Sequence, residues 1–186
     1  MNFLASKNYF CQNAFSNTAF SDTDPLFTAQ GQPRQSIKTS ELGKYKTPQN
    51  PSENYLYEKI IYDSSIELEV IKEDIKKAQD FSVKVFAKLP KFTIPTPYKD
   101  YQPDFAYVLE SKSGATIFFV CETKGYESTS DIPSPQKRKI DYARRFFESL
   151  NEHFKATHQN AKVIFTTRIN KQDLLATINQ ALKDSK

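Results

Sequence analysis

Two acidic residues and one lysine bracket an apolar stretch in this sequence. Asp104 precedes the apolar run 115–121, and Glu122 and Lys124 follow that run directly. Side chains at positions i and i+2 of a strand share a face, so Glu122 and Lys124 point the same way if the run is a strand. Two neighbouring carboxylates suit a hard divalent cation such as Mg²⁺. An adjacent lysine suits orienting a water molecule or stabilising charge on a phosphate.

The segments around these residues predict a hairpin that would bring them together. Residues 101–110 are rich in aromatic and aliphatic side chains and predict one strand, and residues 112–114 form a turn signal. The apolar run 115–121 is too short to cross a membrane and suits a buried second strand. In an antiparallel hairpin the start of one strand lies beside the end of the other. Asp104 is therefore expected to converge with Glu122 and Lys124 at one end of a sheet.

A wider set of motifs carries a resemblance to a known family. Pro103-Asp104 and Glu122-Thr123-Lys124-Gly125 match the PD…ExK pattern of metal-dependent phosphodiesterases. Together with residues 62–67 and 83–97, they make the chain from about Tyr55 onward similar to the C-terminal endonuclease domain of the Res subunit of type III restriction-modification enzymes. The resemblance implies a PD-(D/E)XK nuclease fold, Mg²⁺-dependent cleavage of double-stranded DNA, and a methyltransferase (Mod) subunit as partner.

The resemblance also assigns roles within the site. It implies that Asp104, Glu122 and Lys124 are catalytic, with Asp104 and Glu122 as metal ligands and the backbone carbonyl of Thr123 completing the coordination. Mg²⁺ is the expected cofactor and Mn²⁺ is expected to substitute for it. ATP is expected only in a full-length enzyme that carries a motor. From the short pattern alone, an acidic pair at a strand end with a solvated lysine is the structural alternative.

Glu67 has two interpretations. Ser64 and Glu67 match a capping box, which predicts a helix from Ser64 to about Ala78. Apolar residues at helical spacing within 56–61 predict a helical stretch before it. The cap alone would explain Glu67, whereas the resemblance implies an additional acid near the metal, supplied by the first helix. We expect Glu67 to assist catalysis.

Residues 81–89 predict the first strand of the domain. The alternation of side chains predicts one face with Val83, Val85 and Ala87 and an opposite face with Lys84, Phe86 and Lys88. Prolines between residues 90 and 103 forbid regular pairing and indicate a rigid connection. The lysines along this part of the chain serve either solubility or contact with phosphate near a cleft, and they are Lys88, Lys91 and Lys99.

A long amphipathic helix is predicted after the catalytic motif, with Ser134 as N-cap and Pro135 as first helical residue. Its apolar stripe consists of Ile140, Ala143, Phe147, Leu150 and Phe154. The opposite side is either a solvated face or a DNA-binding face. The residues of that side are Lys137, Arg138, Arg144 and Arg145, with Gln136 as a further candidate for positioning water or DNA. A strand over 162–168 and a helix over 171–183 complete the predicted elements.

Length and composition bound the class of protein. The 186 residues suffice for one domain and a tail, and a formal net charge of +4 permits nucleic-acid binding without indicating it. Cys11 and Cys121 provide neither a disulfide framework nor a zinc site, and the two histidines exclude His-rich metal chemistry. The sequence predicts neither a signal peptide nor a membrane span, so a cytoplasmic location is expected.

The chain divides into two parts by composition. Residues 1–50 are rich in Asn, Ser, Thr and Gln and are expected to be irregular or disordered, whereas residues 51–186 are expected to form the endonuclease domain. The enzymes it resembles carry an ATP-dependent motor before the nuclease domain. No GxxxxGK[ST] nucleotide-binding loop is present, so the chain looks like a detached or truncated C-terminal piece.

The predicted order of elements is helix, strand, strand, strand, helix, strand, helix. This order implies an α/β fold with a central mixed sheet of four to five strands and helices on both faces. The expected function is that of a Mg²⁺-dependent DNA endonuclease domain. Two alternatives are a non-catalytic module or remnant that binds DNA or the Mod subunit, and a different PD-(D/E)XK nuclease that acts on single-stranded or structured DNA.

Overall fold

The computed structural model describes residues 28, 30, 32, 34–73, 81–91, 93, 94, 96–112, 114, 116–157, 161–169 and 174–184. Its helices are α2 (Thr39–Leu42), α3 (Ser65–Lys72), α4 (Ser134–Ala156) and α5 (Leu174–Asp184), with a 3₁₀ turn η1 at Thr129–Asp131. Its strands are β1 (Tyr45–Lys46), β2 (Ile61–Tyr62), β3 (Phe81–Lys88), β4 (Phe105–Ser111), β5 (Thr116–Lys124) and β6 (Val163–Ile169). Among these described helices, none is both long and apolar enough to span a membrane.

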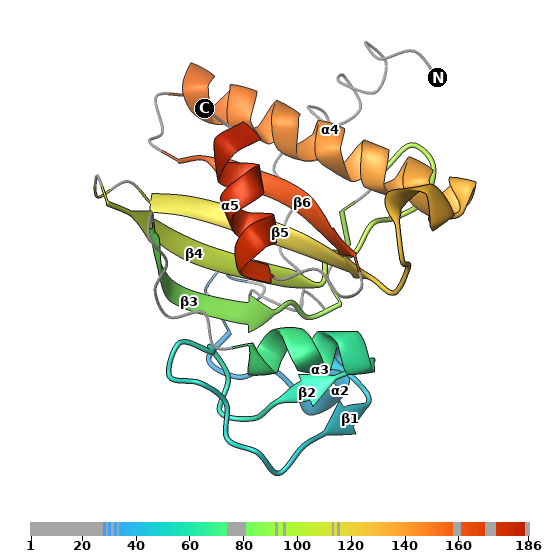
Figure 1. Cartoon of the computed structure of the whole chain (residues 1–186). Helices are drawn as coiled ribbons and strands as arrows, with labels where there is room; N and C mark the ends of the chain where they lie inside the picture. Colours follow the sequence, from blue (N-terminus) through green and yellow to red (C-terminus); the bar gives the residue numbers. More distant parts are fainter. Residues whose placement is uncertain are drawn as a thin grey trace.

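The centre of the molecule is a four-stranded sheet in the order β3-β4-β5-β6 (Figure 1). β3 pairs with β4, and β4 with β5, in antiparallel fashion, whereas β5 pairs with β6 in parallel. The parallel pair requires a crossover, and α4 provides it. The α/β class and the mixed sheet predicted from the sequence are therefore confirmed.

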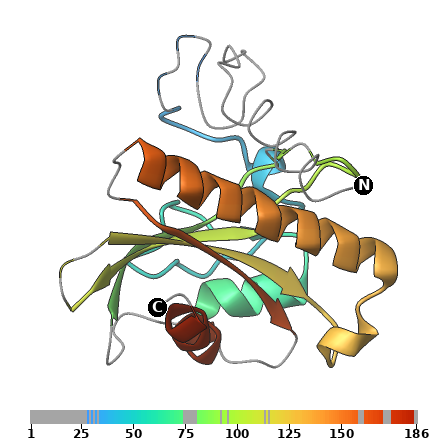
Figure 2. The same cartoon turned by 90° about the horizontal axis from the view of Figure 1, so that it is seen from above.

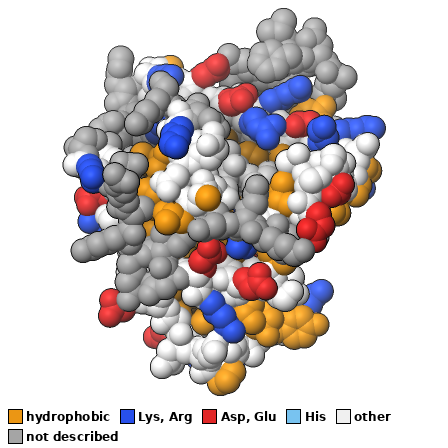
Figure 3. All heavy atoms as spheres, in the orientation of Figure 1, with side chains coloured by type: hydrophobic (Ala, Val, Ile, Leu, Met, Phe, Trp, Pro, Cys, Tyr) orange, Lys and Arg blue, Asp and Glu red, His pale blue; other side chains and the backbone are white. Residues whose placement is uncertain are grey.

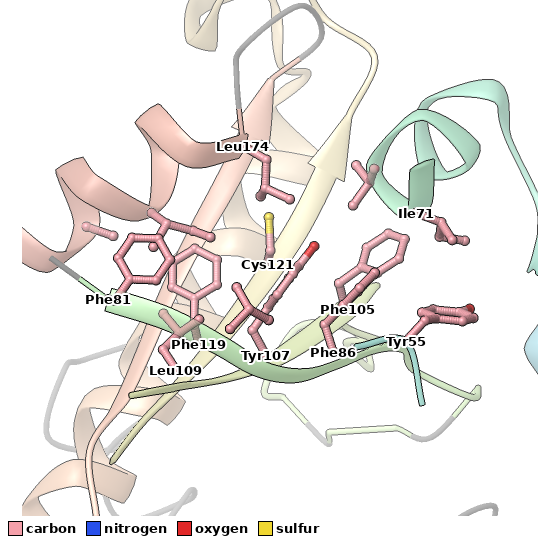
Figure 4. Packing of buried hydrophobic residues seen from close by; sticks show 14 of the residues in the cluster. Tyr55, Ile71, Phe81, Phe86, Phe105, Tyr107, Leu109, Phe119, Cys121 and Leu174 are labelled. Carbon is pink, nitrogen blue, oxygen red and sulfur yellow. The ribbon is translucent and has the colours of Figure 1, made fainter. Parts of the chain in front are cut away.

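Helices cover both faces of this sheet, as predicted. Figure 2 shows α4 on one side and α3 and α5 on the other. On the α3 and α5 side, Val70 and Ile178 pack with strand residues such as Phe105, and Figure 4 shows the aromatic rings of this core. On the opposite side, Ala143 and Phe147 of α4 pack against Val120 and Val163, in agreement with the predicted apolar stripe.

The β4–β5 hairpin predicted from the sequence is confirmed. Phe105 pairs with Cys121 at one end of the hairpin and Glu110 with Thr116 at the other. Gly114 has a φ of 81°, which only glycine adopts at low cost, and its N–H donates to the carbonyl of Ser111 at 3.0 Å. The turn signal read from the sequence therefore corresponds to a tight turn between the strand that follows Asp104 and the strand that ends in Glu122 and Lys124.

The predicted faces of β3 are wrong beyond Val83. Val83 pairs with Leu109 and Val85 with Val108, so Lys84 is an extra residue that forms a β-bulge. The bulge reverses the alternation, and Phe86 joins Val83 in the core on the α3 and α5 side. Lys88 lies opposite Phe105 and takes that same face.

The structure corrects the expectations for the chain before α3. Residues 56–61 are not helical, since Leu56 N–H donates to the carbonyl of Phe86 at 2.9 Å and Ile61 belongs to β2. Pairing with β3 therefore overrides the helical spacing. α2 and β1 lie within the segment expected to be irregular, and β1 pairs with β2 through Tyr45 and Tyr62. Residues 1–27 lie outside the described residues.

Helix ends differ from the predictions in two places. α3 ends at Lys72 instead of near Ala78, because Glu73 is extended and accepts hydrogen bonds from Leu174 N–H at 3.1 Å and Arg168 at 3.2 Å. Residues 74–80 lie outside the described part. α4 begins one residue earlier than predicted, with Pro133 rather than Ser134 as N-cap. The strand predicted over 162–168 is confirmed as β6, and α5 is described from Leu174 onward.

Candidate active site

Asp104 lies at the entry to β4, one step beyond the pairing of Phe105 with Cys121. Its Oδ2 accepts hydrogen bonds from both the N–H and the hydroxyl of Thr123, each at 2.7 Å. Its carbonyl accepts from the N–H of Leu89 at 2.7 Å. Asp104 Oδ1 accepts no hydrogen bond from the described part of the chain. One carboxylate oxygen is thus fixed by β5 and the other is available to a ligand.

Glu122 is buried near the end of β5, with 6% of its surface exposed. Its Oε2 accepts a hydrogen bond from the hydroxyl of Tyr101 at 2.8 Å, and its Oε1 forms an ion pair with Lys124 Nζ. The contact with Lys124 confirms that positions i and i+2 share a face. With Asp104, these residues form a set of two carboxylates and one lysine, here called the Asp104 cluster (Asp104, Glu122 and Lys124).

The electrostatics of Glu122 differ from those of an ordinary surface carboxylate. Burial, followed by the charge of Asp104, raises the pKa of Glu122 to about 7, although Lys124 and Tyr101 oppose the shift. The two carboxylates therefore compete for a limited amount of positive charge. A divalent cation between them would favour the ionised form of both.

Tyr101 is a site residue that the sequence analysis did not single out. It is buried, and it is held by paired backbone hydrogen bonds with Ile94 at 2.8 and 2.9 Å. Burial, and then the charge of Glu122, raise the pKa of Tyr101 well above its usual value, so its hydroxyl remains a donor. The only local signal was an aromatic residue just before Pro103-Asp104.

Glu67 forms part of the predicted cap but with a different partner. Ser64 Oγ accepts from Glu67 N–H at 3.3 Å, which confirms Ser64 as N-cap. Glu67 Oε2 accepts from the N–H of Asp63 at 2.7 Å rather than from that of Ser64. Burial raises the pKa of Glu67, and the charge of Asp104 adds to the rise, while the Asp63 hydrogen bond and Lys88 oppose it. Glu67 is therefore within electrostatic reach of the Asp104 cluster.

Gly125 explains how α3 approaches the end of β5. A Cβ atom at Gly125 would lie 2.9 Å from Cδ1 of Ile66, the residue before Glu67. A side chain at this position would have to displace the tip of the Ile66 side chain, in the first turn of α3. The glycine that closes the Glu122-Thr123-Lys124-Gly125 motif thus lies directly beside the helix that bears Glu67.

Both sequence interpretations of Lys88 are wrong. Lys88 is 5% exposed, so it neither serves solubility nor contacts a phosphate at the surface. Its Nζ donates to the carbonyl of Leu42 at 2.5 Å and to Asp63 Oδ2 at 2.9 Å, and it lies 3.3 Å from Glu67 Oε2. We call Asp63, Glu67 and Lys88 the Lys88 cluster. Lys91 and Lys99 are exposed, as either interpretation would allow.

The basic residues of α4 contact aromatic and acidic neighbours. Lys137, Arg138 and Arg144 are exposed, and Figure 3 shows Lys and Arg side chains over α4 with acidic ones between them. Arg138 lies over the ring of Tyr98, 5.5 Å from its centroid, and Arg144 pairs with Asp141 at 3.1 Å. Arg145 is half-buried 5.6 Å from the centroid of Tyr142, and Gln136 lies in the first turn.

The residues of the Asp104 cluster fit a hard divalent cation. The candidate donors are carboxylate oxygens, which Mg²⁺ prefers, and Asp104 Oδ1 is accessible to a ligand. Within the described ranges, no group of three or more His, Cys, Asp or Glu side chains is arranged to hold a metal ion. Two carboxylates are nevertheless a usual protein contribution to a Mg²⁺ site, because this ion keeps several waters. Cys121 is a buried thiol whose pKa burial raises to about 12, so it is not a thiolate ligand.

Comparison with known proteins identifies the class. A family model described as an endonuclease domain matches residues 53–171, which include Glu67, Asp104, Glu122 and Lys124. The chain therefore belongs to this endonuclease-domain family. It is similar to the Res subunit of the type III restriction-modification enzyme EcoPI of Escherichia phage P1, with 32% identity over 158 residues. It is also similar to the EcoP15I Res subunit of Escherichia coli, with 33% identity over 158 residues.

These alignments cover 83% of this chain but only 15% of each relative. The chain thus corresponds to a small part of the length of the Res subunits it matches. No solved structure matches it significantly. The family resemblance drawn from the sequence motifs is confirmed, and the roles of individual residues are argued below from their geometry.

Proposed function

We propose that this domain hydrolyses phosphodiester bonds of DNA with Mg²⁺ as cofactor, through a PD-(D/E)XK site made of Asp104, Glu122 and Lys124. The observation that carries the proposal is the convergence of these three residues at one end of the β4–β5 hairpin. The rise of the Glu122 pKa to about 7 supports it, because burial and Asp104 leave this carboxylate short of positive charge. A structural acidic pair would gain nothing from that arrangement.

Each residue has a role that its contacts allow. Asp104 and Glu122 hold the cation, with the backbone carbonyl of Thr123 as a further ligand, and Mn²⁺ substitutes for Mg²⁺. A cation held there would polarise a phosphate oxygen and lower the pKa of a coordinated water. Lys124, paired with Glu122, donates to the attacking water or to a non-bridging phosphate oxygen. Glu67 assists from α3, on the side of Asp104.

The proposed substrate is double-stranded DNA, and the proposed location is the cytoplasm. The basic residues of α4 contact phosphates, with Gln136 at the start of the helix. The ring of Tyr98 beside Arg138 adds an aromatic group to this surface. The relatives are Res subunits of restriction-modification enzymes, so a Mod subunit is the proposed partner. ATP is required only where a motor accompanies the domain.

The test is cleavage of plasmid DNA by the purified chain with Mg²⁺ or Mn²⁺, with EDTA as the metal-free control. Asp104→Asn should abolish cleavage and Mn²⁺ binding while the fold survives, because it keeps the shape but removes the charge. Asp100→Asn is the matched control, since Asp100 is an exposed aspartate just before the motif. Undiminished Mn²⁺ affinity in Asp104→Asn, measured by calorimetry, would reject Asp104 as a ligand. Metal-independent cleavage would reject the mechanism.

A further inference from the structure

Asp63 and Lys88 have no role in the mechanism proposed above, but they contact Glu67, which has one. We propose that Lys88 is a positioning residue of the active site: it holds Glu67 in the orientation in which the free oxygen of Glu67 serves the metal site. Residues before the matched family region, at the end of α2, complete this support. The inference rests on the proposed function, and its test separates the two.

Lys88 Nζ has three close oxygen partners. It donates hydrogen bonds to Leu42 O and Asp63 Oδ2 and forms an ion pair with Glu67 Oε2 at 3.3 Å. A buried cation is stable only when paired and hydrogen-bonded in this way. Lys88 therefore has one well-defined position, unlike an exposed lysine.

This position determines which oxygen of Glu67 is available. Oε2 accepts from Asp63 N–H at 2.7 Å and lies 3.3 Å from Lys88 Nζ. Oε1 of Glu67 accepts no hydrogen bond from the described residues. Two contacts on one oxygen fix the plane of the carboxylate, and the other oxygen is left for a cation or a metal-bound water. Asp104 lies close enough to raise the pKa of Glu67, and the residue after Lys88 donates its N–H to the Asp104 carbonyl at 2.7 Å.

The bulge at Lys84 is what turns Lys88 toward Glu67. Val83 faces the core shared with α3 and α5, and a regular strand would place Val85 and Ala87 on that face. With one extra residue at Lys84, that face passes to Phe86 and Lys88. A bulge beside an active site that re-aims a side chain is a recurrent use of this feature.

The N-terminal segment completes the cluster from the other side. The carbonyl of Leu42 accepts from Lys88, and the N–H of Lys44 donates to Asp63 Oδ1 at 3.1 Å. The N–H of Lys91 donates to the carbonyl of Glu41 at 3.2 Å. These three contacts join residues 41–44, which precede the matched region 53–171, to the strand and helix that carry Lys88 and Glu67.

The experiment compares five proteins: the parental chain, Lys88→Met, Glu67→Gln, Lys88→Met combined with Glu67→Gln, and Lys112→Met. Lys112→Met is the control, because Lys112 is an exposed lysine just after β4, at the end of the hairpin away from Asp104. Mn²⁺ affinity is measured by calorimetry and the melting temperature by circular dichroism. Since loss of an outer partner of a metal site typically costs about 10–100-fold in affinity, Lys88→Met should weaken Mn²⁺ binding by that factor, and Lys112→Met should not.

The double variant distinguishes positioning from general stability. If Lys88 acts through Glu67, the double variant should bind Mn²⁺ as Glu67→Gln alone does, because coupled residues are not additive. It should also melt at a higher temperature than Lys88→Met, since Glu67 no longer carries a buried unpaired charge. The comparison of Mn²⁺ affinity between the double variant and Glu67→Gln holds even if Lys88→Met alone does not fold.

The outcomes separate the inference from the proposed function. If the parental chain binds Mn²⁺ and Lys88→Met binds it equally well, the positioning role is rejected and the metal site stands. A double variant that loses the product of the two single losses would also reject it, because Lys88 would then act by another route. If the parental chain binds no Mn²⁺, the metal site and the positioning role fall together.

Discussion

The end of the sheet carries two clusters that have the same composition but hold their carboxylates differently. Each has two carboxylates and one lysine. In the Asp104 cluster, burial and Asp104 raise the pKa of Glu122 to about 7 despite Lys124. In the Lys88 cluster, burial would raise the pKa of Asp63, but Lys88, Lys91 and the N–H of Lys44 outweigh it and lower that pKa. The pKa of Glu67 in the same cluster is still raised, because burial outweighs Lys88 and the Asp63 hydrogen bond. Lys88 therefore satisfies the aspartate of its cluster, whereas the buried glutamate of each cluster has a raised pKa.

The difference lies in how each lysine is held. Lys88 has 6% of its side chain exposed, donates hydrogen bonds to Leu42 and Asp63, and forms an ion pair with Glu67. Lys124 has 17% exposed, and the contact shown for it in the structure is with Glu122 two residues away. A buried lysine with fixed acceptors supports its neighbours, whereas a lysine at a strand end can exchange a carboxylate for a phosphate. The comparison separates a group that maintains geometry from a group available for chemistry.

The largest expected effect comes from the lysine of the Asp104 cluster. Lys124→Ala should lower the rate of DNA cleavage by about 10²–10³-fold, the usual loss for a charge aimed at the transition state. DNA affinity should barely change, because one phosphate contact is a small part of the total. Single-turnover cleavage and DNA binding are measured on the same preparations. Cleavage at the parental rate would remove Lys124 from the mechanism.

The next effect concerns DNA binding and should leave both clusters intact. Combined replacement by alanine of Lys137, Arg138, Arg144 and Arg145 should weaken DNA binding. If all four contact phosphates, the slope of log affinity against log salt should fall by up to about 3.6, since each contact contributes about 0.9. Mn²⁺ affinity should be unchanged. An unaltered salt dependence would indicate that this face is a solvated surface that does not contact phosphates.

The raised pKa of Glu122 makes the free energy of unfolding depend on pH in the direction opposite to that of most folded-state carboxylates. Its pKa is about 7 in the folded protein against an ordinary value of 4.5, so the folded state holds the proton more tightly. The free energy of unfolding of the metal-free protein should therefore fall as pH rises from about 4.5 through 7. Glu122→Gln should remove this slope and stabilise the metal-free protein at pH 8 by up to about 3 kcal/mol. Chemical denaturation at pH 5 and pH 8 measures the effect, and an unchanged slope would contradict it.

The smallest expected effect is the opposite change in the Lys88 cluster. The pKa of Asp63 is lowered in the folded state, so its contribution to stability is present above its ordinary pKa and is lost as pH falls through the folded value. Asp63→Asn should destabilise the protein by about 1–2 kcal/mol at pH 7, as expected for loss of a charge-assisted hydrogen bond. The same denaturation series measures it. Stabilisation by Asp63→Asn would contradict the contrast between the clusters.

The Asp104 cluster could be predicted from the sequence because its geometry is local. Glu122 and Lys124 are two residues apart on one strand, and a tight turn brings Asp104 alongside them. The strands, the two helix-covered faces and the apolar stripe of α4 follow from the same kind of periodic pattern. Tyr101 was not predicted, because its role depends on a hydrogen bond from its buried hydroxyl to Glu122, and spacing along the chain does not indicate such a contact.

The Lys88 cluster could not be predicted because each of its contacts is long-range or depends on the bulge. Leu42 lies 46 residues before Lys88 in the chain, and Asp63 lies 25 residues before it. The alternation within β3 pointed to the wrong face, since no residue type marks Lys84 as the extra residue. The helical spacing of residues 56–61 was misleading for a similar reason, because hydrogen bonds to Phe86 determine the backbone there.

The bulge at Lys84 divides β3 into two parts in which the side chains alternate in opposite order. Before it, odd-numbered side chains face the core with α3 and α5, and after it even-numbered ones do. In a regular strand with Lys84 paired in the ladder, Phe86 and Lys88 would exchange faces with Val85 and Ala87. A lysine would enter the layer beneath α4 while Glu67 faced an alanine. The one extra residue of this strand is therefore as much a part of the site as the identity of its residues.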